Sequence, residues 1–284
     1  MRLPSVLTIA GSDSSGGAGI QADIKTAIAN GVYAMSAVTA LTAQNTMGVT
    51  GIHEVPPEFL AEEINEVFAD IRPDAVKVGM VASVPLIRTI AERLFAHNAR
   101  HVVVDPVIVA ASGSRLLAED AAGALAAELF PLAEVVTPNL PELLVLDEIA
   151  GGSPESVEDY NSIEARIEAA QRILSRLGAP VLVKGGHTIG RSRSDDVLVT
   201  RDGVEVFPAE RIQTKNTHGT GCTLSTAIAS NLAKGMTLPK AVERAKAFII
   251  GALAAGLDMG HSSGPLHHGF ALMSKFIGPG EGNA

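Results

Sequence analysis

Short, almost uninterrupted apolar runs alternate with longer segments of helical periodicity from the start of the chain to about residue 184. Runs without polar alternation are typical of strands buried on both faces of a parallel sheet. The predicted strands are residues 6–10, 36–41, 75–78, 101–105, 134–137 and 181–184. The predicted helices are residues 18–30, 57–69, 85–97, 120–129, 140–149 and 162–177. The alternation predicts an α/β fold with a doubly wound, mostly parallel sheet and helices on both faces.

The pattern changes after the last of these strands. Residues 196–200 and 204–208 flank Asp202-Gly203, a strong signal for a tight antiparallel hairpin. Two further helices are predicted at about 222–234 and 239–257. The polar, glycine- and serine-rich stretch 151–162 is interpreted as a surface loop, because the same pattern resumes after it. We therefore expect a single domain over residues 1–270 and a C-terminal tail over 271–284.

Charge and composition exclude several classes of protein. With 22 Lys and Arg against 31 Asp and Glu, the net charge is −9 and no basic cluster stands out, which argues against a nucleic-acid surface. A phosphorylated ligand remains compatible, because backbone dipoles can hold phosphate in an acidic protein. The single cysteine, Cys222, excludes an intramolecular disulfide. The apolar stretch 247–257 is about half of the ~20 residues that a membrane span needs. We expect a cytoplasmic protein without membrane contact.

Two glycine-rich segments are candidates for anion binding. Residues 11–23 follow the first predicted strand, and Gly17-x-Gly19-x-x-Ala22 fits a relaxed dinucleotide fingerprint. That fingerprint also needs an acidic residue about 20 positions later, and there is none between Asp23 and Glu54, which disfavours a nicotinamide-cofactor enzyme. The second segment, residues 216–222, opens a helix and could form an anion hole for a phosphoryl group. An ordinary glycine turn remains its alternative.

Polar side chains at other predicted strand ends suggest a magnesium and phosphate site. Asp105 ends a run of valines, and Asn139 and Glu142 follow another strand, so their oxygens suit Mg²⁺ bridged to phosphates. The alternatives are a turn residue for Asp105 and a helix-dipole acid for Glu142. Lys184 could place an ammonium on phosphate or could be a solvated strand-end lysine. The trailing His261, His267 and His268 are interpreted as a solvated tail.

Several motifs occur in an order that characterises one family. They are Ala10-Gly11-Ser12-Asp13, Gly16-Gly17-Ala18-Gly19-Ile20-Gln21-Ala22-Asp23, Thr39-Ala40-Leu41-Thr42-Ala43-Gln44-Asn45-Thr46, Lys77-Val78-Gly79-Met80, Asp105-Pro106-Val107, Lys184-Gly185-Gly186-His187 and Thr217-His218-Gly219-Thr220-Gly221-Cys222-Thr223-Leu224-Ser225. Over roughly residues 5–270 the chain resembles the hydroxymethylpyrimidine/phosphomethylpyrimidine kinases of thiamine biosynthesis. The resemblance implies a ribokinase-like fold and two successive phosphorylations, with ATP as donor and Mg²⁺ as metal. The first acts on 4-amino-5-hydroxymethyl-2-methylpyrimidine and the second on its monophosphate.

The resemblance also implies roles for individual residues. The expected pyrimidine-site residues are Gly11, Asp23, Thr42, Gln44 and Met80. The expected ATP-site residues are Asn139, Thr217 and Lys184, and the expected metal ligands are Asp105 and Glu142. A glutamine amide can read the aminopyrimidine edge in pairs, and a thioether can pack against a flat ring. The family often carries a lysine where this chain has Ala111, so a phosphate contact from that loop is not expected.

The catalytic group is expected at Gly219, Thr220, Gly221 and Cys222. A helix N-terminus favours a thiolate, so Cys222 is predicted to act as general base, and a small buried hydrophobe is its alternative. Related vitamin kinases usually carry Asp there, and the cysteine favours pyrimidine over pyridoxal. Pyridoxal kinase, a nicotinamide-cofactor enzyme and a non-catalytic pyrimidine-binding regulator stay open as alternatives. The expected partners are the pyrimidine, ATP and a second copy of the chain.

Overall fold

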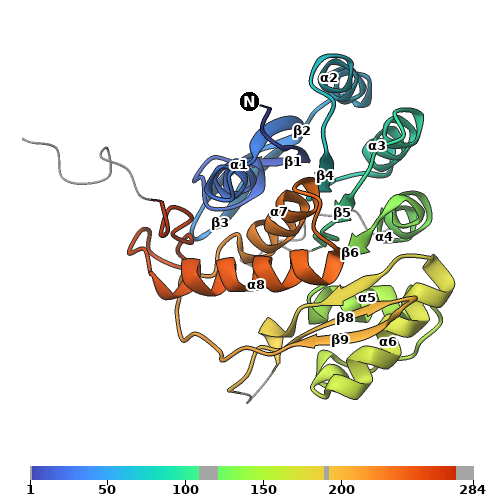
Figure 1. The fold of residues 1–284 in the computed structure, drawn as a ribbon, viewed down its shortest axis with the longest axis vertical. Helices are drawn as coiled ribbons and strands as arrows, with labels where there is room; N and C mark the ends of the chain where they lie inside the picture. The colour runs from blue at the N-terminus through green and yellow to red at the C-terminus, as the bar shows by residue number, and fades with distance from the viewer. Residues whose placement is uncertain (1, 109–120, 189–191, 273–284) are drawn as a thin grey trace, which may run out of the picture.

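The computed structural model describes residues 2–108, 121–188 and 192–272, and within them one mixed sheet runs through the molecule (Figure 1). Its nine strands lie in the order β3-β2-β1-β4-β5-β6-β7-β8-β9. The strands are β1 Ser5–Asp13, β2 Tyr33–Asn45, β3 Gly48–Glu54, β4 Ala75–Val78, β5 Val102–Val104, β6 Val135–Val136, β7 Val181–Val183, β8 Asp196–Thr200 and β9 Gly203–Phe207. Strands β2, β1, β4, β5, β6 and β7 are parallel to their neighbours in this order. Strand β3 pairs antiparallel with β2, and β8 pairs antiparallel with β7 and β9. The predicted fold class and the hairpin are confirmed.

Helices cover both faces of this sheet (Figure 1). One face carries α1 Gly19–Ala29 and α7 Thr220–Ala233, with α8 Leu238–Ala254 packed beside α7. The other face carries α2 Pro57–Asp70, α3 Val84–Ala96, α4 Ala121–Ala124, α5 Leu140–Ile149 and α6 Ile163–Leu177. No helix among the described residues is long and apolar enough to cross a membrane.

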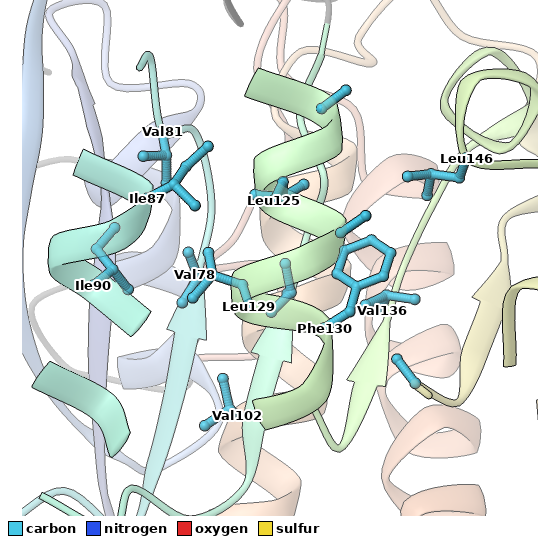
Figure 2. Packing of buried hydrophobic residues seen from close by; sticks show 14 of the residues in the cluster. Val78, Val81, Ile87, Ile90, Val102, Leu125, Leu129, Phe130, Val136 and Leu146 are labelled. Atoms are coloured by element: carbon cyan, nitrogen blue, oxygen red, sulfur yellow. The ribbon is translucent and has the colours of Figure 1, made fainter. Parts of the chain in front are cut away.

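The short strands β5, β6 and β7 are apolar at every position because each side chain meets a helix layer. In β5, Val102 and Val104 belong to the hydrophobic cluster under α2 to α6, whereas Val103 belongs to the cluster under α7 and α8. Successive side chains of a strand point to opposite faces, so a strand covered on both faces needs no polar position. Figure 2 shows Val78, Val102 and Val136 packed against the first of these layers.

The helix predicted over residues 120–129 is interrupted in the structure. Its described part consists of the short α4, a π-helical turn over Leu125–Leu129 and a 3-10 turn over Phe130–Leu132. Leu125, Leu129 and Phe130 all belong to the buried cluster drawn in Figure 2. The residue at position 120 lies outside the described residues.

The sheet edge beyond β2 differs from the prediction. Strand β2 continues to Asn45, well past the predicted end at residue 41, and pairs with β3, which was not predicted. Strand β3 contains Gly48 and Gly51 and is largely exposed, so it lacks the apolar run on which the strand predictions were based. As a result, Thr42 and Gln44 lie inside a strand and not in a loop after one.

The strand order determines where a ligand can enter. Strand β1 lies between β2 and β4, so the chain leaves it toward one side of the sheet and later returns on the other. In open α/β sheets the crevice beyond the carboxyl ends of the strands at such a reversal is the usual binding place. The loops after β1, β4, β5, β6 and β7 all meet there.

Candidate active site

A cavity of about 690 Å³ lies at the carboxyl ends of the central strands and continues along α7 and α8. It brings together residues from all but one of the predicted positions. Those that line it are Gly11, Thr42, Gln44, Met80, Asp105, Asn139, Glu142, Lys184, Thr217, Gly219, Thr220, Gly221 and Cys222. The exception is Asp23, and Ala111 lies outside the described residues.

Asp23 lies beneath the cavity and not on its wall. Its carboxylate is fully buried and accepts hydrogen bonds from Thr8 Oγ1 at 2.5 Å, Thr226 Oγ1 at 2.7 Å and Lys77 Nζ at 2.8 Å. A buried carboxylate needs this full set of donors, because an unpaired charge in the interior is very costly. Asp23 therefore supports the floor of the site, which differs from the expected direct contact with the pyrimidine.

Lys184 holds two carboxylates together at the centre of the cavity. Its ammonium lies 2.8 Å from Asp105 Oδ1 and 3.7 Å from Glu142 Oε2. Burial works against the charge of both carboxylates. For Asp105 the nearby Lys184 ammonium outweighs burial and lowers the pKa. For Glu142 burial and the neighbouring Asp105 carboxylate outweigh Lys184 and raise the pKa to about 7. Burial also works against the charge of Lys184, yet the two carboxylates raise its pKa. The cluster thus keeps a permanent cation beside oxygen ligands.

Asn139 and Glu142 form a capping box at the start of α5. Asn139 Oδ1 accepts from the Glu142 backbone N–H at 2.9 Å, and Glu142 Oε2 accepts from the Asn139 backbone N–H at 2.8 Å. Two otherwise unpaired backbone donors are satisfied in this way. Glu142 therefore caps α5, as the helix-terminus alternative proposed. Its side chain also lines the cavity, so capping does not exclude metal binding.

The N-terminus of α7 lies at the cavity, where the second glycine segment predicted an anion hole. Gly219 caps the helix with φ of 82°, a left-handed conformation that favours glycine, and its Cα packs on the backbone of Gly17. Gly221 approaches the central cluster so closely that a Cβ there would lie 3.1 Å from Asp105 Oδ2 and 3.4 Å from Lys184 Nζ. A phosphoryl group at this place would meet both backbone amides and an ammonium.

The first glycine segment, by contrast, already holds an anion of its own. The Asp13 carboxylate accepts from the backbone N–H groups of Ser15, Gly17 and Ala18 at 2.8–3.0 Å and from His218 Nε2 at 2.8 Å. Burial alone would raise the pKa of Asp13, but the hydrogen bonds from His218, Ser15 and Ala18 lower it to about 2. These amides are engaged by a side chain of the chain itself. The dinucleotide alternative therefore loses the phosphate contacts on which it depended.

One end of the cavity carries the groups expected to read a pyrimidine. Thr42 Oγ1 lies 2.7 Å from the Ser12 carbonyl oxygen and 3.0 Å from Gln44 Oε1, and its single hydrogen can be donated to either oxygen. Met80 Sδ lies so near Gly11 that a Cβ there would be 3.0 Å from the sulfur. The glycine thus lets the thioether pack directly on the backbone, and both residues line the cavity.

A second part of the cavity wall carries four apolar side chains together with charged residues such as Asp196, Arg211 and Lys246, and it was missed in the sequence. Ile212, Ile249, Ile250 and Leu253 line it. Three of them belong to α8, where an apolar face looks like ordinary core packing, so the sequence held no signal for them. Asp13 and His218 belong to two of the family motifs, but only their hydrogen bond in the structure marks them as a pair. His268 also differs from the expected solvated tail, because it is buried and lies 2.9 Å from Thr223 Oγ1.

Comparison with known proteins decides the family. The model of the phosphomethylpyrimidine kinase family matches residues 13–267. The chain belongs to this family.

Individual members of this kinase family and its structural neighbours agree with that assignment. The hydroxymethylpyrimidine/phosphomethylpyrimidine kinase of Rhizobium meliloti is 48% identical over 92% of this chain and 96% of its own length. The thiamine biosynthesis bifunctional protein ThiED of Geobacter sulfurreducens is 48% identical over 93% of this chain, which spans only 52% of that protein. The Clostridium difficile phosphomethylpyrimidine kinase structure matches with a TM-score of 0.75 at 42% identity, covering 88% of this chain and 99% of that one.

The fold is shared with pyridoxal kinases. The ADP complex of Bacillus subtilis pyridoxal kinase matches with a TM-score of 0.84 at 35% identity, covering 94% of this chain and 98% of that one. This TM-score is higher than the 0.75 found for the phosphomethylpyrimidine kinase structure, so the backbone alone does not separate the two groups of kinases. The choice between their substrates must therefore come from side chains.

Cys222 does not have the environment that the helix terminus alone suggested. It is half-buried at the third residue of α7. Burial raises the pKa of its thiol to about 11, because the opposing effect of Lys77 is smaller and Asp23 and Asp105 act in the same direction as burial. The resting group at neutral pH is the thiol, which corrects the expectation of a stabilised thiolate.

This environment predicts the pH dependence of Cys222 alkylation. Only the thiolate reacts, so with a pKa of about 11 the logarithm of the iodoacetamide rate should climb with unit slope through pH 10 without a plateau. Mass spectrometry measures the rate, circular dichroism checks that the fold persists, and glutathione serves as the reference thiol. Because Cys222 is the only cysteine, Cys222→Ala gives the blank. A plateau reached below pH 9 would contradict the buried-thiol assignment.

Proposed function

We propose that this chain is an ATP-dependent kinase that phosphorylates the hydroxymethyl group of 4-amino-5-hydroxymethyl-2-methylpyrimidine and then the resulting monophosphate. One observation carries the proposal in this member of the family. A single cavity joins the polar end at Thr42, Gln44 and Met80 to the amides of α7 and the ammonium of Lys184. A flat acceptor and a phosphoryl donor can therefore meet at Gly221.

The donor nucleotide is proposed to occupy the rest of the cavity. The four apolar side chains of the second wall offer a surface for a base, and Asn139, Thr217 and Lys184 line the path from there to α7. Structures of the Staphylococcus aureus pyridoxal kinase have been solved with the ATP analogue AMP-PCP, which supports a nucleotide in this fold. ATP is accordingly the proposed co-substrate.

Mg²⁺ fits the residues at the centre of the cavity. Among the described residues, no group of three or more acidic, histidine or cysteine side chains gathers around one point. Mg²⁺ on a nucleotide needs no such cage, because it keeps several waters and binds one or two carboxylates together with phosphates. Asp105 and Glu142 would hold it, and it would neutralise charge on the β- and γ-phosphates.

The transfer itself needs positioning and charge stabilisation. The acceptor oxygen attacks the γ-phosphorus, the bond to the ADP oxygen breaks, and the negative charge spreads over the transferring oxygens. Lys184 and the amides of Gly219, Thr220 and Gly221 face that charge. In the first reaction the acceptor is an alcohol whose proton must leave. Cys222 is the proposed acceptor in its thiolate form, so the resting thiol must first release its own proton to solvent. In the second reaction the attacking phosphate oxygen is already ionised at neutral pH and needs no base.

We further propose that the kinase acts in the cytoplasm as a homodimer. The lone cysteine accords with a reducing compartment. Strand β3 forms a sheet edge, and Leu41, Met47 and Ile52 on β2–β3 expose 52%, 65% and 44% of their surface. Exposed apolar edges of this kind are usually covered by a partner. Analytical ultracentrifugation tests the dimer.

The substrate assignment is tested by measuring ADP release with the hydroxymethylpyrimidine, its monophosphate and pyridoxal side by side. We expect release with both pyrimidines at a kcat/KM well above that for pyridoxal. Gln44→Ala should weaken pyrimidine binding by about 1–3 kcal/mol, because it leaves the polar edge of the ring unpaired. Equal kcat/KM for pyridoxal, or an unchanged pyrimidine KM in Gln44→Ala, would contradict the assignment.

Glu142→Gln separates the metal role of this residue from its capping role. The glutamine amide oxygen can still accept from the Asn139 backbone N–H, so the capping box and the thermal stability should be largely kept. The negative charge is lost, and the Mg²⁺ concentration for half-maximal activity should rise by ~10-fold or more with little change in pyrimidine KM. If the Mg²⁺ dependence of Glu142→Gln equals that of the wild type, Glu142 only caps the helix and does not hold the metal.

Cys222→Ala should affect the two phosphorylations differently. With the alcohol, loss of the proton acceptor should lower turnover by ~10²–10⁴-fold. With the monophosphate, whose attacking oxygen carries no proton, turnover should fall by less than ~10-fold. Cys222→Asp should restore part of the first activity, since a carboxylate can accept the same proton. Each substrate is the control for the other, and an equal loss with both would show that the thiol has a packing role.

A further inference from the structure

We propose that Asp13 and His218 form a clamp that positions the amides of α7 for phosphoryl transfer. This inference rests on the proposed kinase function. It assigns the two residues a positioning role, because neither is proposed to touch the reacting atoms. The clamp joins the last residue of β1 to the loop before α7, and the two residues are separated by 205 positions in sequence.

The hydrogen bond between them is buried and defined in direction. Asp13 and His218 are 2% and 7% exposed, and His218 Nε2 lies 2.8 Å from Asp13 Oδ2. An ionised carboxylate can only accept, so Nε2 carries the hydrogen. Ser15 Oγ adds a further donor at 2.8 Å to the three backbone N–H groups. A carboxylate occupied in this way cannot serve as a general base, although it lines the cavity.

The backbones of the two loops are in direct contact around this bond. A Cβ on Gly17 would overlap the His218 ring, and a Cβ on Gly219 would overlap the Gly17 carbonyl oxygen. His218 is also fixed from its other side, since its backbone N–H donates to the Gly264 carbonyl oxygen at 3.0 Å. The two loops are therefore closely packed, and the Asp13 carboxylate adds a charge-assisted hydrogen bond between them.

The anion hole follows this contact directly in the chain. Gly219 caps α7, and Gly221 lies against Asp105 and Lys184 two residues later. The first turn of the helix is thus held between the clamp on one side and the central cluster on the other. A misplacement of about 1 Å at a reacting centre can cost ~10²-fold in rate. Loosening the clamp should therefore slow transfer without removing any catalytic group.

The test compares two buried histidines that both hold α7. His218→Leu keeps the size of the side chain but removes the donor to Asp13, whereas His218→Gln keeps an N–H that can reach the carboxylate. His268→Leu is the matched control, because His268 is buried and bonds to Thr223 in α7, and no hydrogen bond between it and the Asp13 loop is found in the described part of the chain. Melting temperature, kcat and the pyrimidine KM are measured for each.

We expect His218→Leu to lower kcat by ~10–100-fold with a pyrimidine KM within ~3-fold of the wild type, and His218→Gln to recover most of the loss. His268→Leu should lower the melting temperature by a similar amount and keep kcat within ~3-fold. Loss of kcat to the same extent in both leucine variants, or failure of His218→Gln to recover, would reduce the clamp to a stability effect.

A double-mutant cycle and a binding measurement complete the test. Asp13→Asn and His218→Leu should be non-additive in kcat, because each removes the same bond. Calorimetry with AMP-PCP and with adenosine should show that His218→Leu weakens only the phosphate-bearing ligand. The calorimetric measurement needs no turnover, so it tests the clamp separately from the kinase activity. If the wild-type protein binds AMP-PCP but phosphorylates no pyrimidine, the proposed function is refuted and the clamp can still be tested. Additive effects, or equal weakening of both ligands, would refute the clamp.

Discussion

The buried ion pair between Lys77 and Asp23 connects the elements on which the site is built. Lys77 belongs to β4, Asp23 to α1, and the hydroxyl donors to Asp23 come from β1 and α7. Both charged side chains are fully buried, and removing one partner of such a pair typically costs ~3–5 kcal/mol. Gly79 makes room for the ammonium, because a Cβ there would overlap Nζ. The loops after β1 and β4 and the start of α7 thus converge over one polar contact inside an apolar core.

Much of this arrangement could be predicted because buried parallel strands leave a clear pattern. Runs such as Val102–Val104 mark the strands, and the polar residues that follow them, Asp105 and Lys184 among them, must gather at one edge of the sheet. The cavity does contain all the predicted site residues except Asp23. Residues at strand ends were therefore found from sequence, since topology alone brings them together.

The remainder depended on contacts that no local pattern encodes. Strand β3 was missed because its residues are exposed and gain order only by pairing with β2. The depth of Asp23 follows from its bond to Lys77, 54 residues away, and the state of Cys222 follows from burial and not from its helix position. The glycine segment after β1 looked like a phosphate loop because the sequence does not reveal that Asp13 folds back into it.

That internal carboxylate has a consequence for competition by other anions. The anion held by the loop after β1 is the Asp13 carboxylate, which is part of the polypeptide, so a change of buffer cannot change how much of it is present. Under the proposed function, inorganic phosphate, pyrophosphate or sulfate in the medium would compete with the nucleotide at the α7 amides and Lys184 but would find the loop after β1 already filled by Asp13. An inhibitor for this kinase gains little from a second acidic group aimed at that loop. It would gain more from matching the part of the cavity lined by Gln44 and Met80, the residues proposed to read the pyrimidine.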